Sequence, residues 1–392
     1  MAGTLGQTAA VISRDDAAAL DAADPLRRWR DEFVIPDPDL VYLDGNSLGR
    51  PARRTLEAVR RVLDEEWAAG LIRSWDHWVD LPFDAGAALA PLLGVDGDEV
   101  VVHDSVSVNL FQLVHAALAR RPDRRVIVVD PGDFPSVRYV VAGIAAQTGH
   151  EVRAGFERLD EVAVVVRSLV DYRTAEIADV MGETARATAA GALVIWDLSH
   201  AVGVLELDLR GAGVELAVGC TYKFLGSGPG GPGFSYVARE LHPDIEQPVW
   251  GWFGRADQFA MGPAYEPRPD IGRLLIGTPG IAGIAAAKAG AEVVVEAGIA
   301  AVRAKAVALT ALALDLCAEH GLESPTPRDA DRRGGHVSVR HPEARRLVDE
   351  LKAEGVITDF REPDLIRLGC SPLTTRFTDV HAAVSAIARL VR

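Results

Sequence analysis

A lysine and an aspartate follow two apolar runs near the middle of the chain. Lys223 lies in the segment Gly219–Leu225, and Asp197 and His200 lie in Trp196–Ala201. Apolar runs that end on polar residues are typical of strands that deliver side chains to one rim of a parallel sheet. A lysine there can form a Schiff base, and a carboxylate on the neighbouring strand can keep a pyridine nitrogen protonated. The pair therefore predicts a pyridoxal phosphate site.

The phosphate of such a cofactor needs a cradle, for which Asp104–Asn109 is the candidate segment. It follows an apolar run and begins a predicted helix, so its backbone amides, the Ser107 hydroxyl and the helix dipole could face an anion. Ser107 could instead be only the N-cap of that helix. Phe134 follows another predicted strand end, where its ring could lie over the pyridine face or belong to the core. Trp252 stands between glycines, outside any regular pattern.

Two glycine-containing motifs suggest other chemistry. Gly45–Gly49 matches the GxSxG elbow of serine hydrolases and lies between a strand-like run and a helical run. Asp197 and His200, three residues apart, are poorly placed to relay protons to a distant serine, and the alternative is a turn that caps the next helix. Gly226–Gly231 matches GxGxxG, but prolines and a predicted strand follow it, which favours a tight connection over a dinucleotide site.

The composition is that of a globular protein. With 392 residues, of which 48% are hydrophobic and 25% charged, the chain can bury a sizeable core and is expected to form two domains. The net charge of -15 argues against a nucleic-acid partner, because a phosphate-binding surface needs a basic excess. A small-molecule partner is therefore favoured.

The cysteines and histidines predict no metal site and no disulfide. Cys220, Cys317 and Cys370 are far apart and lack CxxC spacing, which is typical of reduced thiols. His336 and His341 lie five residues apart on a predicted strand, and therefore on opposite faces. The N-terminus lacks the pattern of a signal peptide, and no run approaches the roughly 18 apolar residues of a membrane span. We expect a cytoplasmic protein without a membrane partner.

The alternation of apolar and helical runs predicts an α/β fold. Helical stretches such as Ser107–Arg120 separate several of the apolar runs, and strands that alternate with helices form a mostly parallel sheet covered on both faces. The predicted strands are Val100–Val102, Arg125–Asp130, Val162–Ser168, Ala192–Asp197, Leu216–Thr221 and Gly233–Ala238.

Three regions are expected along the chain. Residues 1–40 would form an N-terminal arm and helix, residues 41–285 a large cofactor-binding domain, and residues 286–392 the connecting helices and a small α+β domain. The expected elements outside the sheet are the strands Val41–Asp44, His336–Arg340, Val356–Phe360 and Leu365–Leu368, and helices in Arg50–Trp67, Pro279–His320, Pro342–Glu354 and Thr378–Leu390.

Six segments of the chain together carry a resemblance to a known family: Tyr42–Gly49, Leu71–Trp75, Asp197–Gly203, Cys220–Lys223, Gly251–Gly254 and Phe259–Met261. From about Tyr42 to near its C-terminus, the chain resembles the kynureninase family of the aminotransferase (fold type I) superfamily. The resemblance implies a homodimer with active sites at the subunit interface. It also implies the hydrolysis of L-kynurenine, or of a 3-hydroxy or ring-substituted form, to anthranilate and L-alanine, as in tryptophan catabolism or NAD biosynthesis.

The resemblance also implies residue roles. Lys223 would bind the cofactor and move protons at the substrate α-carbon, and Asp197 would pair with the pyridine nitrogen. Arg367 would bind the substrate carboxylate with its planar fork, although it could also be a solvated arginine at a strand end. Tyr222 would either donate the proton that completes alanine or bind the phosphate. For the cofactor, the resemblance also implies Val106, Ser107, Phe134, Ser168, His200 and Trp252, together with Thr278 of the partner subunit. For the aryl pocket it implies Asn46 and Trp75.

Several positions depart from the family pattern. Val137 stands where the family usually has an aspartate near the cofactor ring, so Asp197 is expected to be the only carboxylate there. Asp171–Ala175 replaces a segment closer to Asn-Tyr-x-Thr-Gly, Gly226 stands where Asn is common, and Thr374 replaces a Tyr. These departures bear on the aryl pocket and the rate rather than on the cofactor.

Two alternatives share the predicted fold. A pyridoxal-dependent desulfurase or other β-lyase would need a reactive cysteine on a mobile loop, but Cys317 lies in a predicted helix and Cys370 lies just beyond Arg367. A non-catalytic relative would keep the fold and lose the site. The presence of Lys223, Asp197 and Arg367 argues against it.

Overall fold

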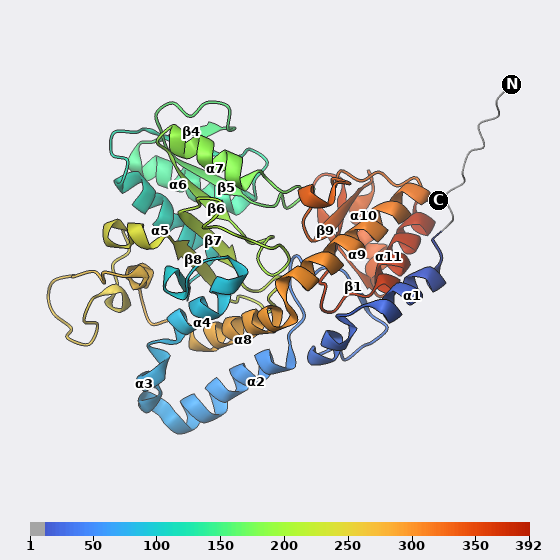
Figure 1. Cartoon of the computed structure of the whole chain (residues 1–392), viewed down its shortest axis with the longest axis horizontal. Helices are drawn as coiled ribbons and strands as arrows, with labels where there is room; N and C mark the ends of the chain where they lie inside the picture. The colour runs from blue at the N-terminus through green and yellow to red at the C-terminus, as the bar shows by residue number, and fades with distance from the viewer. Residues whose placement is uncertain (1–11) are drawn as a thin grey trace.

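A computed structural model describes residues 12–392 of this protein. The predictions for residues 1–11, an unanchored arm without a signal segment, lie outside the described residues. Figure 1 shows a larger unit with a central sheet and a smaller unit beside it, with helices α8 (Ile281–Ala297) and α9 (Ile299–Glu319) running from one to the other.

A seven-stranded sheet forms the centre of the larger unit, in the order β2-β8-β7-β6-β5-β3-β4. Strands β7, β6, β5, β3 and β4 are parallel, and β8 is antiparallel to both of its neighbours. The predicted α/β fold with a mostly parallel sheet is therefore confirmed. The strands are β2 (Val100–His103), β3 (Val126–Val129), β4 (Glu151–Ala154), β5 (Val162–Ser168), β6 (Leu193–Asp197), β7 (Leu216–Cys220) and β8 (Gly233–Val237).

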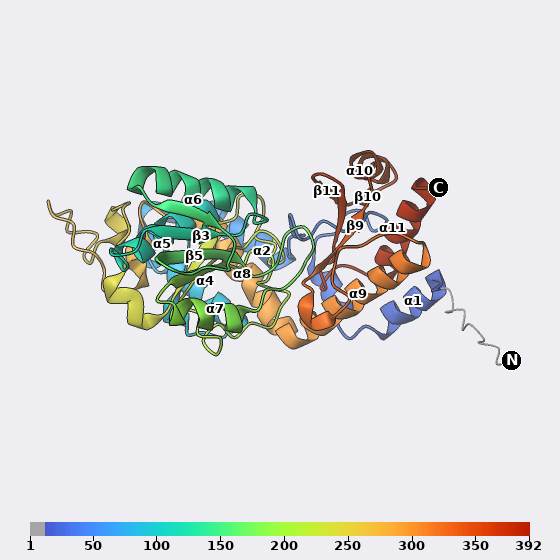
Figure 2. The same cartoon turned by 90° about the horizontal axis from the view of Figure 1, so that it is seen from above.

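Helices cover both faces of this sheet because its central strands are apolar on both sides. Every residue of β6 is buried, as are the apolar residues of β5. One face packs on α5 (Val106–Ala119) and α6 (Pro135–Thr148). The other packs on α4 (Leu81–Leu89), α7 (Val180–Ala189) and α8. Figure 2 shows α6 and α7 on opposite sides of the sheet.

The smaller unit is an antiparallel sheet in the order β11-β12-β9, packed against helices. The predicted single strand Val356–Phe360 is wrong. Its first half, β10 (Val356–Ile357), pairs in parallel with β1 (Val41–Tyr42), and its second half joins β11, so each half serves a different sheet. The remaining elements are β9 (His336–Arg340), β11 (Asp359–Arg361), β12 (Leu365–Gly369), α10 (Ala344–Ala353), α11 (Phe377–Leu390) and α1 (Arg14–Ala23), which packs on α11.

Helices α8 and α9 meet at Gly298 with a bend of 83°. Helix α8 packs on the larger unit, and α9 packs on β9 and α11 of the smaller unit. The predicted domain boundary at residue 285 lies inside α8. In residues 12–392, no single helix is long and apolar enough to cross a membrane, whereas the bent pair of α8 and α9 together is, by length and composition only.

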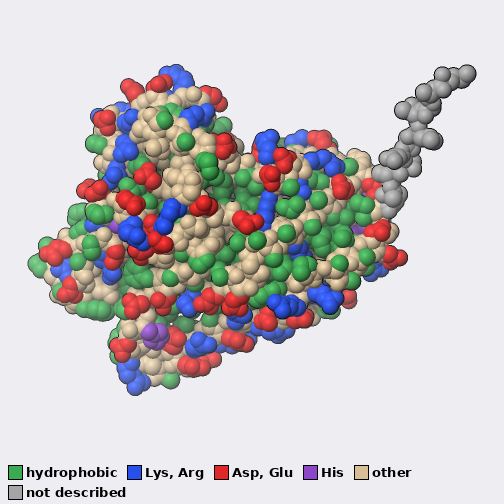
Figure 3. Space-filling model, viewed as in Figure 1, with side chains coloured by type: hydrophobic (Ala, Val, Ile, Leu, Met, Phe, Trp, Pro, Cys, Tyr) green, Lys and Arg blue, Asp and Glu red, His purple; other side chains and the backbone are tan. Residues whose placement is uncertain are grey.

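The predicted helix over Arg50–Trp67 begins three residues later, as α2 (Arg53–Arg61), and continues as a π-helical segment over Val62–Gly70. It is followed by the short helix α3 (Trp75–Trp78). On the face of the molecule seen in Figure 3, acidic and basic side chains are interspersed. Arg54 of α2, for example, pairs with Glu296 of α8.

The fold brings three distant parts of the chain to one place. The parallel strands β5, β6 and β7 end at the same edge of the large sheet, where ligands bind in open α/β sheets. The turn after β1 is tied to β12, because Gly369 donates its backbone N–H to Leu43 and Asp44 forms a bridge with Gly369. The edge of the large sheet, the turn after β1 and the small sheet therefore enclose one site.

Candidate active site

A cavity of about 270 Å³ lies where these three parts meet. Most of the predicted site residues line it, although they come from positions far apart in the sequence. They are Asn46, Val106, Ser107, Phe134, Ser168, Asp197, His200, Tyr222, Lys223 and Arg367.

Lys223 and His200 form a contact at the floor of the cavity. Lys223 Nζ lies 2.9 Å from His200 Nε2. Burial lowers the pKa of Lys223, and burial together with the Lys223 charge lowers the pKa of His200 well below its usual value. A lysine with a lowered pKa has a larger share of the neutral amine, which is the nucleophilic form. His336, fully buried with neither ring nitrogen hydrogen-bonded within residues 12–392, lies behind His200 with ring centroids 5.7 Å apart.

Asp197 is the last residue of β6 and lies beside Ser168, the last residue of β5. Its side chain is 8% exposed, and one oxygen accepts the backbone N–H of Ser199 at 2.8 Å. Among the described residues that line the cavity, Asp197 is the only carboxylate, and a second buried carboxylate lies next to Ser168 outside this lining. Asp133, which sequence reasoning missed, is buried and accepts hydrogen bonds from both the hydroxyl and the backbone N–H of Ser168.

The N-terminus of α5 faces the cavity, as predicted for an anion cradle. Its N-cap is Ser105, whose hydroxyl accepts from Val108 N at 3.5 Å, so Ser107 lies in the first turn instead. The glycine-rich Gly226–Gly231 segment leads into β8 rather than into a helix, which excludes a dinucleotide fingerprint there. Gly226 has φ of 64°, a conformation open to Gly or Asn, so its departure from the family pattern leaves the backbone unstrained.

Two aromatic rings line the cavity near the end of β3. Phe134 is 42% exposed and meets Tyr172 edge to face, with ring centroids 5.3 Å apart. Tyr172 belongs to the divergent Asp171–Ala175 segment, in which Asp171 accepts the backbone N–H groups of the two residues after Tyr172 and so fixes the turn. The sequence shows that this segment departs from the family pattern, but it contains no signal that predicts Tyr172 in the cavity wall.

Arg367 is held rigidly in the opposite wall and is only 1% exposed, which rules out a solvated arginine at a strand end. Its guanidinium forms a bidentate pair with Asp359, donates to Ser47 Oγ at 3.0 Å and donates to the Tyr172 carbonyl at 2.8 Å. Arg361 shares the same Asp359, with 2.7 Å between Arg361 Nη2 and Asp359 Oδ2. No local pattern in the sequence predicts Asp359 or Arg361 as site residues.

The turn after β1 contributes to this wall. The Ser47 hydroxyl donates to Asp359 at 2.9 Å and accepts from Arg367, so its partners are those of a structural hydroxyl rather than the histidine base that a serine nucleophile needs. Burial and the nearby Asp359 raise the pKa of Asp44 to about 6. Asn46 is fully buried, and its side-chain nitrogen and oxygen have no partner within residues 12–392.

Three predicted site residues lie outside the cavity of a single chain. Trp75 packs edge-on against Trp78 at 5.4 Å and against Trp252 at 6.4 Å. Thr278 lines a separate hollow that also includes Asp104. The roles of Trp75, Trp252 and Thr278 stay predictions, and that of Thr278 depends on a second subunit.

Of the remaining departures, Val137 lines the cavity and Thr374 does not. Thr374 is buried, and its carbonyl accepts a hydrogen bond from Arg30. All three cysteines of the chain are buried, and burial raises the pKa of Cys317 and that of Cys370 to about 12. A reactive thiol needs exposure and a lowered pKa, so none suits a desulfurase.

Among solved structures, the chain is similar to cysteine desulfurases. That of Thermococcus onnurineus NA1, solved in its apo form, has a TM-score of 0.79 and 17% sequence identity, over 90% of this chain and 95% of that one. A desulfurase of Escherichia coli has a TM-score of 0.78 and 18% identity, over 93% and 98% of the two chains. At this identity the likeness shows the shared fold alone.

The sequence relatives are closer. A family model described as the kynureninase C-terminal domain matches residues 302–387. A kynureninase of Pseudomonas fluorescens is 42% identical over 97% of this chain and 96% of its own length. A kynureninase of Burkholderia mallei is 41% identical over 96% of this chain and 94% of its own length. The predicted family is thereby confirmed, and the chain belongs to the kynureninase family.

Proposed function

We propose that this protein hydrolyses the Cβ–Cγ bond of L-kynurenine, with pyridoxal phosphate as its cofactor, and releases anthranilate and L-alanine. One observation carries the proposal: Lys223, Asp197 and Arg367 line a single cavity in a chain that is related to kynureninases over nearly its whole length. A 3-hydroxy or ring-substituted kynurenine presents the same reacting groups and belongs to the same substrate class.

The residues present fit the cofactor. Lys223 offers an amine with a lowered pKa, suited to covalent attachment. Asp197 offers a carboxylate for the pyridine nitrogen, and the first turn of α5 offers backbone N–H groups and the Ser107 hydroxyl for the phosphate. When bound, pyridoxal phosphate supplies an electron sink for the charge that develops at the substrate α-carbon.

We place the substrate carboxylate against Arg367. Asp359 and Ser47 hold the guanidinium in one orientation, so little conformational freedom is lost when the substrate binds. Arg361 adds a second positive charge on the same side. Asn46 supports a polar contact with the substrate, because buried side-chain groups without a partner are rare unless a ligand or water satisfies them.

The proton transfers fall to Lys223 and Tyr222. Lys223 lines the cavity with a lowered pKa and would act as the base at the substrate α-carbon, and His200 beside it is kept neutral by burial. Burial also raises the pKa of Tyr222, so its phenol keeps its proton at neutral pH. A protonated phenol suits both roles considered for Tyr222, as proton donor to the departing alanine carbon and as a phosphate ligand.

A homodimer with shared active sites is part of the proposal. Large exposed apolar side chains support it, because such side chains are typical of interaction surfaces. A mixture of the inactive variants K223A and W252A tests whether sites are shared between subunits. If Trp252 contributes to the partner's cavity, mixed dimers should regain activity. Mixed dimers that regain no activity would contradict this sharing. The exposed side chains are Trp67, Ile72, Trp250, Phe259 and Met261.

The activity test is direct. Purified protein, supplied with pyridoxal phosphate and L-kynurenine, should release fluorescent anthranilate, and K223A should release none. Lys288→Ala, which removes a lysine on the surface of α8, is the matched control and should stay active. A wild-type protein that binds the cofactor yet leaves kynurenine and its ring-substituted forms intact would refute the substrate. The buried thiols also support a cytoplasmic location.

A further inference from the structure

We propose that Asp133 is a positioning residue of the cofactor site, which holds Ser168 in place and adds a negative charge behind Asp197. The proposal assumes that the cofactor ring lies against Asp197, as put forward above. It concerns a carboxylate that the reaction itself does not use and that lies four residues before Val137.

The first argument is geometric. Asp133 follows β3 and is 5% exposed. One of its oxygens accepts the Ser168 hydroxyl at 2.5 Å and the Phe134 backbone N–H at 2.8 Å, and the other accepts the Ser168 backbone N–H at 3.2 Å. Ser168 is the register partner of Asp197 on the neighbouring strand. Asp133 therefore fixes the end of β5 directly beside the carboxylate predicted to meet the cofactor.

The second argument is that Asp133 lines a hollow next to the main cavity, with Ser168 lying between the two. Ser168 lines both the main cavity and a neighbouring hollow of about 790 Å³, and Asp133 lines the latter. Asp130 and Arg167 face the same hollow, but Arg167 is paired with Asp130 and Glu183. Within residues 12–392, Asp133 makes no ion pair of its own.

The electrostatics follow from this enclosure. Burial raises the pKa of Asp133 to about 6, and the charges of Asp197 and Asp130 act in the same direction, while the Ser168 hydroxyl and the Phe134 N–H oppose them. Asp133 is thus neutral well below pH 6 and charged well above it. A protonated pyridine ring beside Asp197 favours the charged form of Asp133, and by linkage the charged form favours the ring. Cofactor affinity should therefore respond to the ionisation of Asp133.

The test compares the dissociation constant of pyridoxal phosphate for wild-type and D133N apoprotein between pH 5 and pH 8. Titrations of the cofactor itself cancel in the ratio of the two constants. We expect a ratio near one at pH 5 that rises to about three- to tenfold weaker binding by D133N above pH 7, the effect of one charge at moderate distance. The D179N variant is the control, because it makes the same Asp-to-Asn change in the same hollow, at the N-cap of α7. The ratio of its dissociation constant to that of the wild type should not change between pH 5 and pH 8.

A ratio that is the same at every pH would overturn the proposal, because a purely structural role does not depend on the charge of Asp133. If D133N folds poorly, Ser168→Ala gives a second test. Loss of the hydroxyl donor raises the Asp133 pKa, so binding should weaken most just above pH 6 and less at pH 5 and pH 8. A uniform weakening would contradict the proposal. A wild-type protein that binds no pyridoxal phosphate at any pH would instead refute the proposed function.

Discussion

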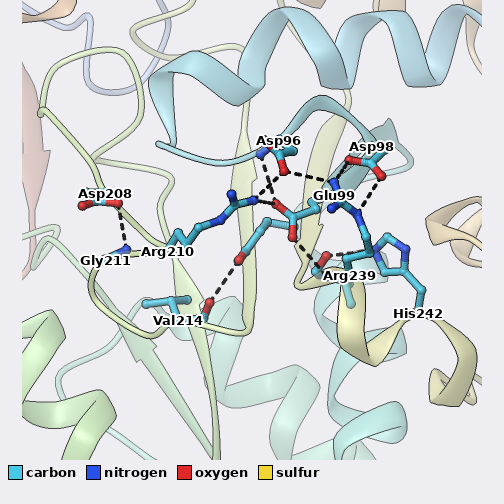
Figure 4. Close-up of polar contacts among 11 residues, drawn as sticks. Asp96, Asp98, Glu99, Asp208, Arg210, Gly211, Val214, Arg239 and His242 are labelled. Carbon is cyan, nitrogen blue, oxygen red and sulfur yellow. Dashed lines mark hydrogen bonds and ion pairs between the residues drawn. The ribbon is translucent and has the colours of Figure 1, made fainter.

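Two clusters of charged residues in this protein differ in their surroundings. One, here called the cavity cluster, consists of Asp44, Asp359, Arg361 and Arg367. It lies in the wall of the active-site cavity, and its central arginine is 1% exposed. The other, here called the surface cluster, is shown in Figure 4 and consists of Asp96, Asp98, Glu99, Arg210 and Arg239.

Both clusters have good hydrogen-bond geometry, so geometry alone does not tell them apart. In the surface cluster the side chains of Arg210 and Arg239 are 52% exposed, and water competes for their pairs with Asp96 and Asp98. Exposed pairs of this kind contribute little to stability. In the cavity cluster the side chains of Arg367 and Asp359 are only 1% and 14% exposed, so this pair has lost most of its water, which costs folding free energy. We infer that the cavity cluster is retained for binding and the surface cluster contributes mainly to solubility.

The largest effect is expected for Arg367→Gln. The substitution leaves Asp359 buried with Arg361 as its remaining charged partner, and we expect a loss of about 3 kcal/mol of unfolding free energy. It also removes the proposed carboxylate ligand, so kcat/KM should fall at least about a hundredfold. Arg340→Gln on the adjacent strand, where the arginine is exposed, is the control for both readouts. Equal effects of the two variants would contradict the comparison.

Asp44→Asn should stabilise the protein. The pKa of Asp44 is about 6 in the folded chain, above the usual value of 3.8, so between these values the folded state binds the proton more tightly. The stability that this proton confers is lost as the pH rises from about 4 to about 6, and above that window the charged carboxylate destabilises the folded state. At pH 8 the variant should be about 1–2 kcal/mol more stable in urea unfolding, with the difference vanishing near pH 4.

Within the surface cluster, Glu99 is the exception, because it is 3% exposed. It accepts the backbone N–H groups of Asp96 and Arg239 at 3.0 and 3.1 Å, and the Arg210 guanidinium at 2.6 Å. Glu99→Gln should therefore cost about 1–2 kcal/mol of unfolding free energy. An unchanged urea midpoint would show that, in this cluster, the burial of a charged side chain does not determine how much its hydrogen bonds contribute to stability.

The smallest effect is expected for Asp98→Asn. Within residues 12–392 its carboxylate pairs with Arg239 alone, and the Arg239 side chain is 52% exposed, so at physiological ionic strength the urea midpoint should not move measurably. A clear loss of stability that disappears in high salt would mean that the surface cluster contributes more than its exposure suggests.

The sequence allowed the prediction of elements and residues with strong local signals. Apolar strands ending on polar residues placed Asp197 and Lys223 correctly at one edge of a parallel sheet. Partners set by tertiary contacts were missed. Ser47 and Asp359 are hydrogen-bonded across 312 residues of sequence, and Asp133 reaches Ser168 across 35. Neither contact has a local pattern, because each joins segments that only the tertiary fold brings together.

The measurement that tests the central claim most directly is covalent mapping of the cofactor. The chain has only four lysines, Lys223, Lys288, Lys305 and Lys352. After reconstitution with pyridoxal phosphate and reduction with borohydride, mass spectrometry of the peptides should find the reduced cofactor on Lys223 alone. Attachment to one of the other three lysines, or no attachment in a protein that has folded, would contradict the assignment of this cavity as the active site.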